Sequence, residues 1–331
     1  MDIALWGCGG MGNSLANALL GTGEARLAAV YDLDPAAAAA AAERYGAQTA
    51  PSPEALLAQP GLAGVIIALP GDQHAPATIQ TAQAGLGIFV EKPMSVTVAG
   101  CQEMLAAARR YGVGLMVGQV VRWYEPYRTI LRWQAEGRFG RLFAASIWRV
   151  MDGRVWPQDH WRLSHASSGG PLLEVGAHEL DMLRCMFGRP DTVHAIAHKS
   201  LPTGGEWADF IAVQIRFTDG TTATYESGAG SHAGRYGFRL FFEGATLTSE
   251  AAFDRNSLRA FGPGGKPIEI DASEFSDERP VEAELRGWLA ALRGDAPMPV
   301  PGEEGMATVA LAEAAYRSAA TGQIVAYQSG A

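Results

Sequence analysis

Cysteine is scarce in this sequence, and its scarcity removes several classes of protein. Cys8, Cys101 and Cys185 are the only three in 331 residues, and they lie far apart. An odd number of distant cysteines does not build a disulfide framework, so we expect a reducing, cytoplasmic environment. No CxxC pair occurs, and a zinc-ribbon site is therefore not indicated.

Charge and long apolar runs are also in short supply. Charged residues make up 18% of the chain, the formal net charge is −9, and no basic run occurs. Nucleic acid and anionic membrane surfaces are therefore not expected partners. No apolar stretch is long enough to span a bilayer. The chain enters an apolar run at residue 3 without a basic leader, so we expect no targeting segment.

The first 120 residues alternate short apolar runs with alanine-rich helical patterns. Asp34, Pro35 and Gly46 mark the start and end of one such helix as N-cap, first residue and stop. Strands alternating with helices predict βαβ units and a parallel sheet. The expected strands are 3–6, 27–32, 64–70, 87–93 and 114–119, and the expected helices include 11–20, 35–45 and 97–111.

The pattern changes after Gly118. In "FIAVQIRF" apolar residues alternate with others, which is typical of a sheet with one apolar face. We predict an α/β protein with a Rossmann domain over 1–120 and, over 121–331, a second α/β domain whose open sheet is mostly antiparallel. Its expected helices are 123–137, 171–187, 280–293 and 305–321, and its expected strands are 142–150, 192–200, 209–218, 221–228 and 238–249.

A glycine-rich turn follows the first strand. Gly7, Gly9 and Gly12 have GxGxxG spacing between a strand and a helix, the context in which this motif binds a dinucleotide pyrophosphate. Asp32 ends the next strand, where a carboxylate accepts hydrogen bonds from the adenosine ribose and repels a 2′-phosphate. No Lys or Arg lies in 31–36, which favours NAD over NADP. An ordinary βα turn, with Asp32 as a turn residue, is the alternative.

The segment "EKP" ends the fourth of these strands. Ligands of open parallel sheets bind at the carboxyl ends of the strands, where Lys92 lies. Pro93 restricts Lys92 to extended conformations, and a cis bond between them is compatible with the sequence. A lysine in a desolvated site can take part in proton transfer. Position alone equally fits a solvated lysine at a strand end.

A second cluster lies in "SSGGPLLEVGAHELDML". Glu174, His178 and Asp181 are spaced i, i+4, i+7, which predicts one face of a helix beginning at Pro171. Histidine can take a hydroxyl proton while hydride leaves the same carbon. A core histidine with surface acids is the alternative. A metal site on the same face is a weak alternative, because "HELDM" lacks the second histidine of HExxH, and we assign no metal.

These motifs together resemble the glucose-fructose oxidoreductase/inositol dehydrogenase/MocA-type family. The resemblance rests on GxGxxG at 7–12, "IALPGDQH" at 67–74, "EKP" at 91–93, "GGPLLEVGAHELD" at 169–181 and the C-terminal helices, and it spans essentially the whole chain. It implies Lys92 and His178 as the catalytic pair, with Glu174 contacting substrate. Arg122 and Tyr236 match further substrate-binding places. The implied cofactor-binding residues are Gly7, Gly9, Gly10, Met11, Gly12, Asp32, Leu69, Pro70, His74, Glu91, Lys92, Trp161 and Arg162.

The resemblance also implies an activity. We expect NAD-dependent oxidation of a secondary hydroxyl of a sugar, sugar derivative or cyclitol, or the reverse reduction, in a homodimer or homotetramer. An enzyme that retains NAD and cleaves glycosides through transient oxidation is the first alternative. A non-catalytic NAD or sugar sensor is the second, although a sensor needs neither Lys92 nor His178. Two departures stand out: Glu174 replaces the Asp of inositol dehydrogenases, and Gly71 replaces a common Asn. For His74, helix N-terminal packing is an alternative role.

Overall fold

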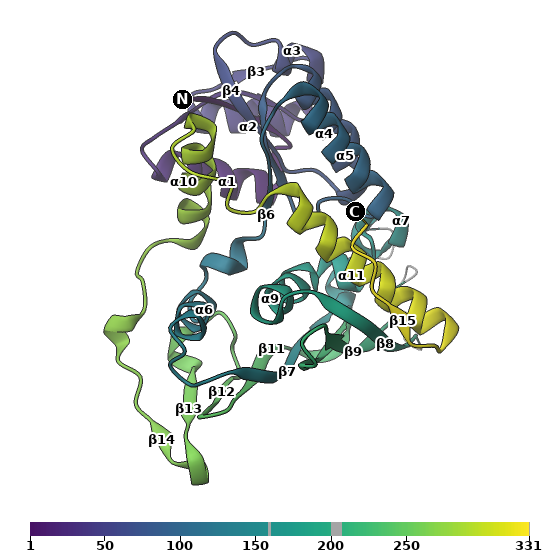
Figure 1. The fold of residues 1–331 in the computed structure, drawn as a ribbon. Coiled ribbons are helices and arrows are strands. Elements are labelled where there is room, and N and C mark those ends of the chain that lie inside the picture. The colour runs from purple at the N-terminus through teal and green to yellow at the C-terminus, as the bar shows by residue number, and fades with distance from the viewer. Residues whose placement is uncertain (158–159, 200–206, 331) are drawn as a thin grey trace. The chain divides into compact units, whose positions relative to one another are not determined.

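The computed structural model describes residues 1–157, 160–199 and 207–330, which divide into two compact units (Figure 1). The first unit comprises Met1–Val120 and Glu278–Met306, and the second comprises Val121–Asp277 and Ala307–Ala331. One boundary between the units falls at Val120. The expected second domain, 121–331, differs from this division because residues 278–306 return to the first unit.

The first unit is built on a six-stranded parallel sheet, as predicted. Its strand order is β3-β2-β1-β4-β5-β6, and each neighbouring pair is parallel. All five residues of β5 are buried, which requires cover on both faces of the sheet. The strands are β1 (Asp2–Trp6), β2 (Arg26–Tyr31), β3 (Gln48–Thr49), β4 (Leu62–Ile67), β5 (Gly87–Glu91) and β6 (Leu115–Gly118).

Helices connect these strands, and their ends follow the expected capping residues. Asp34 accepts a hydrogen bond from the N–H of Ala36, and Gly46 ends the helix in the left-handed conformation. The helices are α1 (Gly10–Gly21), α2 (Pro35–Tyr45), α3 (Pro53–Leu57), η1 (Gly71–Gln73), α4 (His74–Gln83) and α5 (Val98–Tyr111).

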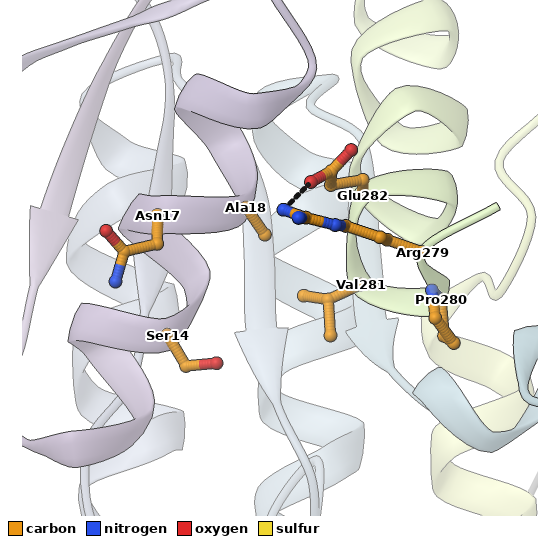
Figure 2. A pocket seen from close by; sticks show the side chains of 7 residues that line it. All are labelled: Ser14, Asn17, Ala18, Arg279, Pro280, Val281 and Glu282. Carbon is orange, nitrogen blue, oxygen red and sulfur yellow. Dashed lines mark hydrogen bonds and ion pairs between the residues drawn. The ribbon is translucent and has the colours of Figure 1, made fainter.

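The returning segment contains α10 (Pro280–Arg293), which packs beside α1 (Figure 1). Trp288 of α10 is fully buried, and its ring contacts Phe89 of β5 edge-on. A Cβ on Gly64 would lie 2.9 Å from the Trp288 ring, so glycine leaves room for this helix. Figure 2 shows a small pocket between α1 and α10, crossed by the Arg279–Glu282 ion pair. None of the predicted site residues lines it.

The second unit is built on a nine-stranded mixed sheet with the order β14-β13-β12-β11-β7-β10-β9-β8-β15. β7 and β10 are parallel and the other pairs are antiparallel, as expected for a mostly antiparallel sheet. The strands are β7 (Leu142–Asp152), β8 (Pro190–His198), β9 (Phe210–Phe217), β10 (Thr222–Gly228), β11 (Gly230–Phe242), β12 (Thr246–Ser249), β13 (Arg259–Phe261), β14 (Pro267–Ile268) and β15 (Val325–Ala326).

The second unit also contains several helices, some of which contact this sheet (Figure 1). The first of them is α6 (Tyr127–Ala135), which follows the 3₁₀ turn η2 (Val120–Trp123). Pro126 lies between η2 and α6, so the helix predicted over 123–137 begins only after this proline. The others are η3 (Gly153–Val155), η4 (Trp161–Leu163), α7 (His165–Ser168), α8 (Pro171–Glu174), α9 (Ala177–Phe187) and α11 (Gly302–Thr321), which continues from the first unit. Three short 3₁₀ turns complete the elements: η5 (Arg255–Ser257), η6 (Pro263–Gly265) and η7 (Ala272–Glu274).

One predicted strand and one predicted helix are each divided into two elements in the structure. The strand expected over 238–249 is the hairpin of β11 and β12, because the chain turns at Glu243–Gly244 and the Phe242 N–H donates to the Ala245 carbonyl. The helix expected over 171–187 is broken at Val175–Gly176 into α8 and α9. The last residue of the strand expected over 192–200 lies outside the described residues, as do positions 158 and 159, between η3 and η4.

Candidate active site

The glycine-rich turn has the geometry of a dinucleotide-binding loop. Gly7 has φ +103°, and a Cβ there would lie 2.3 Å from the Ala68 carbonyl oxygen. A Cβ on Gly12 would lie 1.9 Å from the Gly7 carbonyl oxygen, so this glycine permits the close packing of α1 on the strand. A Cβ on Gly9 or Gly10 would meet no described atom within 4 Å. No side chain caps the N-terminus of α1, which leaves its N–H groups for an anion.

Asp32 lies beside this loop and fixes it. Its Oδ2 accepts a hydrogen bond from the Cys8 N–H at 2.6 Å, and its Oδ1 accepts one from the Asp34 N–H at 2.9 Å. The carboxylate is therefore held at the end of β2, next to the glycines. Burial, and secondly the charge of Asp32, raise the pKa of the Cys8 thiol to about 12. Cys8 is thus a neutral thiol in the loop at physiological pH.

A basic side chain also approaches the loop, from outside the window that the sequence analysis considered. Arg44, near the end of α2, donates to the Asn13 side-chain oxygen at 3.4 Å. Asn13 in turn donates to the carbonyls of Cys8 and Gly9 at 2.6 and 2.9 Å. Sequence inspection of 31–36 missed Arg44 because α2 separates it from Asp32 in the chain.

Lys92 follows β5 directly, at the carboxyl edge of the parallel sheet. The Lys92–Pro93 peptide bond is cis, as the sequence allows. The Lys92 N–H donates to the carboxylate of Glu91 at 3.1 Å, and Glu91 and Pro93 are buried while Lys92 is half-buried. The lysine backbone is therefore embedded, and its side chain starts from a fixed peptide.

His74 contacts two segments of the predicted site. It is the first residue of α4 and is 1% exposed. Its Nδ1 lies 2.7 Å from the Pro93 carbonyl oxygen, and its Nε2 lies 2.8 Å from the Leu69 carbonyl oxygen. The structure thus brings Leu69, His74 and the Lys92–Pro93 peptide together in the first unit.

In the second unit, Glu174 and Arg162 form an ion pair. Arg162 Nε donates to Glu174 Oε1 at 2.7 Å, and the Glu174 side chain is 11% exposed. The Arg162 guanidinium lies 4.7 Å from the centre of the Trp161 ring and 5.8 Å from that of Trp156, within cation–π range. Trp161 and Arg162, predicted to contact the cofactor, therefore lie in one cluster with Glu174, which is predicted to bind substrate.

His178 lies in the first turn of α9, after a break that the sequence analysis did not predict. Glu174 ends α8, so the continuous helical face expected for Glu174, His178 and Asp181 is wrong. A Cβ on Gly176 would lie 2.4 Å from the Tyr225 hydroxyl, so a strand fifty residues further on occupies the space of a side chain. His178 is 8% exposed, and it lies in the second unit while Lys92 lies in the first.

Arg122 contacts α9 rather than open solvent. Its Nε and Nη2 donate to the two carboxylate oxygens of Asp181, each at 2.7 Å. Asp181 is 1% exposed, and Thr308 donates to it as well, at 3.4 Å. This fork-to-fork pairing ties the first residues after the junction to the helix that carries His178.

A second arginine reaches the same helix and was missed by the sequence analysis. Arg149 of β7 donates through Nη1 to both carboxylate oxygens of Glu179, at 3.0 and 3.3 Å. Burial by itself lowers the pKa of Arg149, but the charge of Glu179 and its hydrogen bond to Arg149, together with the neighbouring Tyr225 and Tyr127, raise the pKa overall. Burial, with Glu179 nearby, raises the pKa of Tyr127 and Tyr225 well above the ordinary value, so both phenols are neutral. Arg149 is a charged residue inside the apolar run "LFAASIWRV", and this was the signal in the sequence that could have identified it.

Tyr236, a predicted substrate-binding residue, lies against this pair. Its ring is 5.8 Å from the Arg149 guanidinium carbon and 5.0 Å from the Phe253 ring, and the residue is 40% exposed. Arg149 therefore contacts Tyr236 on one side and, on the other, Glu179, which is the residue next to His178.

Comparison with known proteins identifies the family. The model of the oxidoreductase family with an NAD-binding Rossmann fold matches residues 1–119, and the GFO/IDH/MocA C-terminal domain model matches residues 127–248. The chain belongs to the GFO/IDH/MocA family of oxidoreductases, which confirms the resemblance. It is an α/β oxidoreductase with an NAD-binding Rossmann domain.

Three relatives illustrate the similarity. Inositol 2-dehydrogenase of Rhizobium meliloti is 29% identical over 326 residues, covering 96% of each chain. The structure of aldose-aldose oxidoreductase from Caulobacter crescentus, complexed with glycerol, matches with a TM-score of 0.89 and 25% identity, covering 98% of this chain and 99% of that one. The structure of levoglucosan dehydrogenase in complex with NADH has a TM-score of 0.88 at 20% identity, covering 99% of each chain, and shows the same fold.

The residues of the first unit fit a nicotinamide dinucleotide. Open space at Gly9 and Gly10, an uncapped helix N-terminus and a carboxylate at the end of β2 are what its pyrophosphate and adenosine ribose need. Within the described residues, no group of three His, Cys, Asp or Glu side chains is placed to hold a metal ion, and no helix is long and apolar enough to cross a membrane.

Proposed function

We propose that this protein oxidises a secondary hydroxyl of a sugar, sugar derivative or cyclitol to a ketone or lactone, or catalyses the reverse reduction. The observation that carries this is the position of Lys92, directly after β5, at the same sheet edge as the glycine loop and Asp32. The substrate class is supported by relatives named for inositol and aldoses. NAD, when bound, accepts the hydride.

The chain's own residues divide the remaining work. His178 takes the proton of the reacting hydroxyl, and Lys92 donates a hydrogen bond to the same oxygen. Glu174 accepts hydrogen bonds from substrate hydroxyls, with Arg162 holding its carboxylate in place. Arg122, which is paired with Asp181, and Tyr236 are proposed to line the substrate site.

The test is a substrate screen that follows NADH absorbance. Purified protein is supplied with NAD or NADP and with a panel of aldoses, inositols and anhydrosugars. On any substrate found, Lys92→Met and His178→Asn should each lower kcat by about 100-fold or more, in the range of general acid–base effects. Turnover by either variant at the wild-type rate would remove that residue from the mechanism.

We further propose a homodimer or homotetramer in the cytoplasm. The face of the nine-stranded sheet opposite α9 carries the row Trp148, Glu226, Ala212 and Ile196 across four strands, and Ile196 is 68% exposed. Ile196 and Phe210, two exposed apolar side chains on this face of adjacent strands, support self-association. Light scattering after size exclusion should give a multiple of 35.0 kDa, and Ile196→Glu should lower it. Cysteines that form no disulfide within the described residues support a reducing compartment, which cell fractionation tests.

A further inference from the structure

His74 occupies an unusual place in the first unit. It is 99% buried by accessible surface, yet both of its ring nitrogens face carbonyl oxygens, one on each side. Carbonyl oxygens only accept hydrogen bonds, so each contact requires an N–H on the imidazole. A neutral ring satisfies one contact, and an imidazolium satisfies both. Because both ring nitrogens face backbone carbonyls, the ring is embedded in protein, and the geometry does not favour a direct contact with the cofactor ribose.

The two partners of His74 belong to separate parts of the predicted site. Nδ1 faces the carbonyl of Pro93, the residue that follows Lys92, at 2.7 Å. Nε2 faces the carbonyl of Leu69, in the loop after β4, at 2.8 Å. The ring therefore spans the loops that follow two neighbouring strands of the sheet, β4 and β5. His74 therefore contacts both loops at once.

We propose that His74 is a positioning residue for Lys92. Its Nδ1–H donates to the Pro93 carbonyl and so holds the peptide from which the lysine side chain starts. When the ring is protonated on both nitrogens, Nε2–H donates to the Leu69 carbonyl as well and anchors the ring to that loop. This inference rests on the proposed catalytic role of Lys92. A misplacement of about 1 Å at a reacting group is enough to lower turnover about 100-fold, so a contact one residue away can control the rate.

Amide side chains separate the two contacts. The amide nitrogen of Asn overlaps the place of histidine Nδ1, and that of Gln overlaps the place of Nε2. His74→Asn therefore keeps a donor toward Pro93, and His74→Gln keeps one toward Leu69. His74→Leu keeps neither. All three are compared with wild type in steady-state kinetics on the substrate that the screen identifies.

We expect His74→Asn to retain kcat within about 3-fold, and His74→Gln and His74→Leu to lose about 10- to 100-fold. If the role of His74 were purely structural, kcat would follow the stability of each variant rather than the position of its hydrogen-bond donor. Thermal unfolding midpoints of the Asn and Gln variants are therefore measured alongside, and the comparison holds even if the Leu variant does not fold. Wild-type kcat in His74→Leu, or equal kcat in the Asn and Gln variants, overturns the proposal.

A control on the same helix guards against a general effect of α4. Thr78 lies one turn after His74, is fully buried, and its hydroxyl has no hydrogen-bond partner among the described residues. Thr78→Val should leave kcat unchanged, and a loss like that of His74→Leu would count against the proposal. Lys92→Met separates the two levels of inference. If it turns over normally, the proposed function fails; if it is inactive while the His74 variants are all alike, only the inference about His74 fails.

Discussion

Arg149 and Glu179 form a buried ion pair between β7 and α9, with Nη1 3.0 Å from Oε1 and 3.3 Å from Oε2. Glu179 is 1% exposed and the Arg149 side chain is 23% exposed. Removing one partner of a buried pair leaves an uncompensated charge, which typically costs about 3–5 kcal/mol. Arg149→Met should therefore lower the free energy of unfolding by about that amount, measured by urea denaturation.

A double variant tests whether the cost comes from the stranded charge. Replacing both partners by apolar residues of similar volume is often neutral for stability. Arg149→Met with Glu179→Leu should therefore recover most of the loss. Arg141→Met is the matched control, because Arg141 lies just before the same strand in an exposed pair with Glu243. It should change stability by about 0–1 kcal/mol. A double variant as unstable as Arg149→Met would contradict this account.

The contact between Gly176 and Tyr225 predicts a suppressor. Gly176→Ala places a methyl group 2.4 Å from the Tyr225 hydroxyl, and overpacking of this kind costs about 1–3 kcal/mol. Adding Tyr225→Phe removes the clashing oxygen, and part of the loss should be recovered. The ring carbons at 3.1 Å keep the recovery incomplete.

Gly234→Ala is the control for this pair. A Cβ on Gly234 meets only the Val150 carbonyl oxygen, at 3.8 Å, so the substitution fits without movement. Thermal unfolding of Gly176→Ala, of Gly176→Ala with Tyr225→Phe, and of Gly234→Ala checks the order of stability. The idea is wrong if Gly176→Ala is as stable as Gly234→Ala, or if Tyr225→Phe gives no recovery in the Gly176→Ala background.

The same contact shows where sequence reasoning succeeds and where it stops. Local signals place α2 correctly, since Asp34 caps it and Gly46 ends it within the chain segment itself. The break at Gly176 depends on Tyr225, which is distant in sequence, so a continuous helix was the expectation. The packing of Trp288 on β5 is likewise invisible to local periodicity, and residues 278–306, expected in the second domain, group with the first unit.

Candidate residues could be recognised more readily than their partners. Lys92, Glu174 and His178 stand out by type and spacing. Arg162 beside Glu174 and Arg149 beside Glu179 required coordinates, because neither partner lies at helical spacing.

The neutral thiol of Cys8 predicts slow alkylation. A thiol reacts as its thiolate, and a pKa raised to about 12 leaves about a thousandth of it ionised at pH 9. An unperturbed thiol, with a pKa of about 8.5, is mostly ionised there. Iodoacetamide at pH 9, followed by peptide mass spectrometry, should therefore label Cys8 far more slowly in the native protein than in urea-denatured protein. Equal labelling rates in the native and the denatured protein would be inconsistent with a buried, neutral Cys8.

Asp32 and Arg44 predict how the choice between NAD and NADP can be changed. The Asp32 carboxylate, which binds the glycine-rich loop, repels a 2′-phosphate. Arg44 lies beside the same loop, where it donates a hydrogen bond to Asn13. Asp32→Asn keeps an oxygen that can accept from the Cys8 N–H but removes the charge. The ratio of kcat/KM for NADP to that for NAD should rise about 10-fold or more, which corresponds to about 1.4 kcal/mol of transition-state binding.

Arg44→Ala tests where the gain comes from. In the Asp32→Asn background it should reduce the NADP gain, because the guanidinium is then no longer available to the phosphate. In the wild-type background it should leave the kcat/KM for NAD within about 3-fold, since the NAD ribose carries no phosphate. Thermal shifts with each cofactor report binding independently of turnover. An unchanged ratio in Asp32→Asn would show that the carboxylate does not set cofactor preference, and an undiminished ratio in the double variant would remove Arg44 from the account.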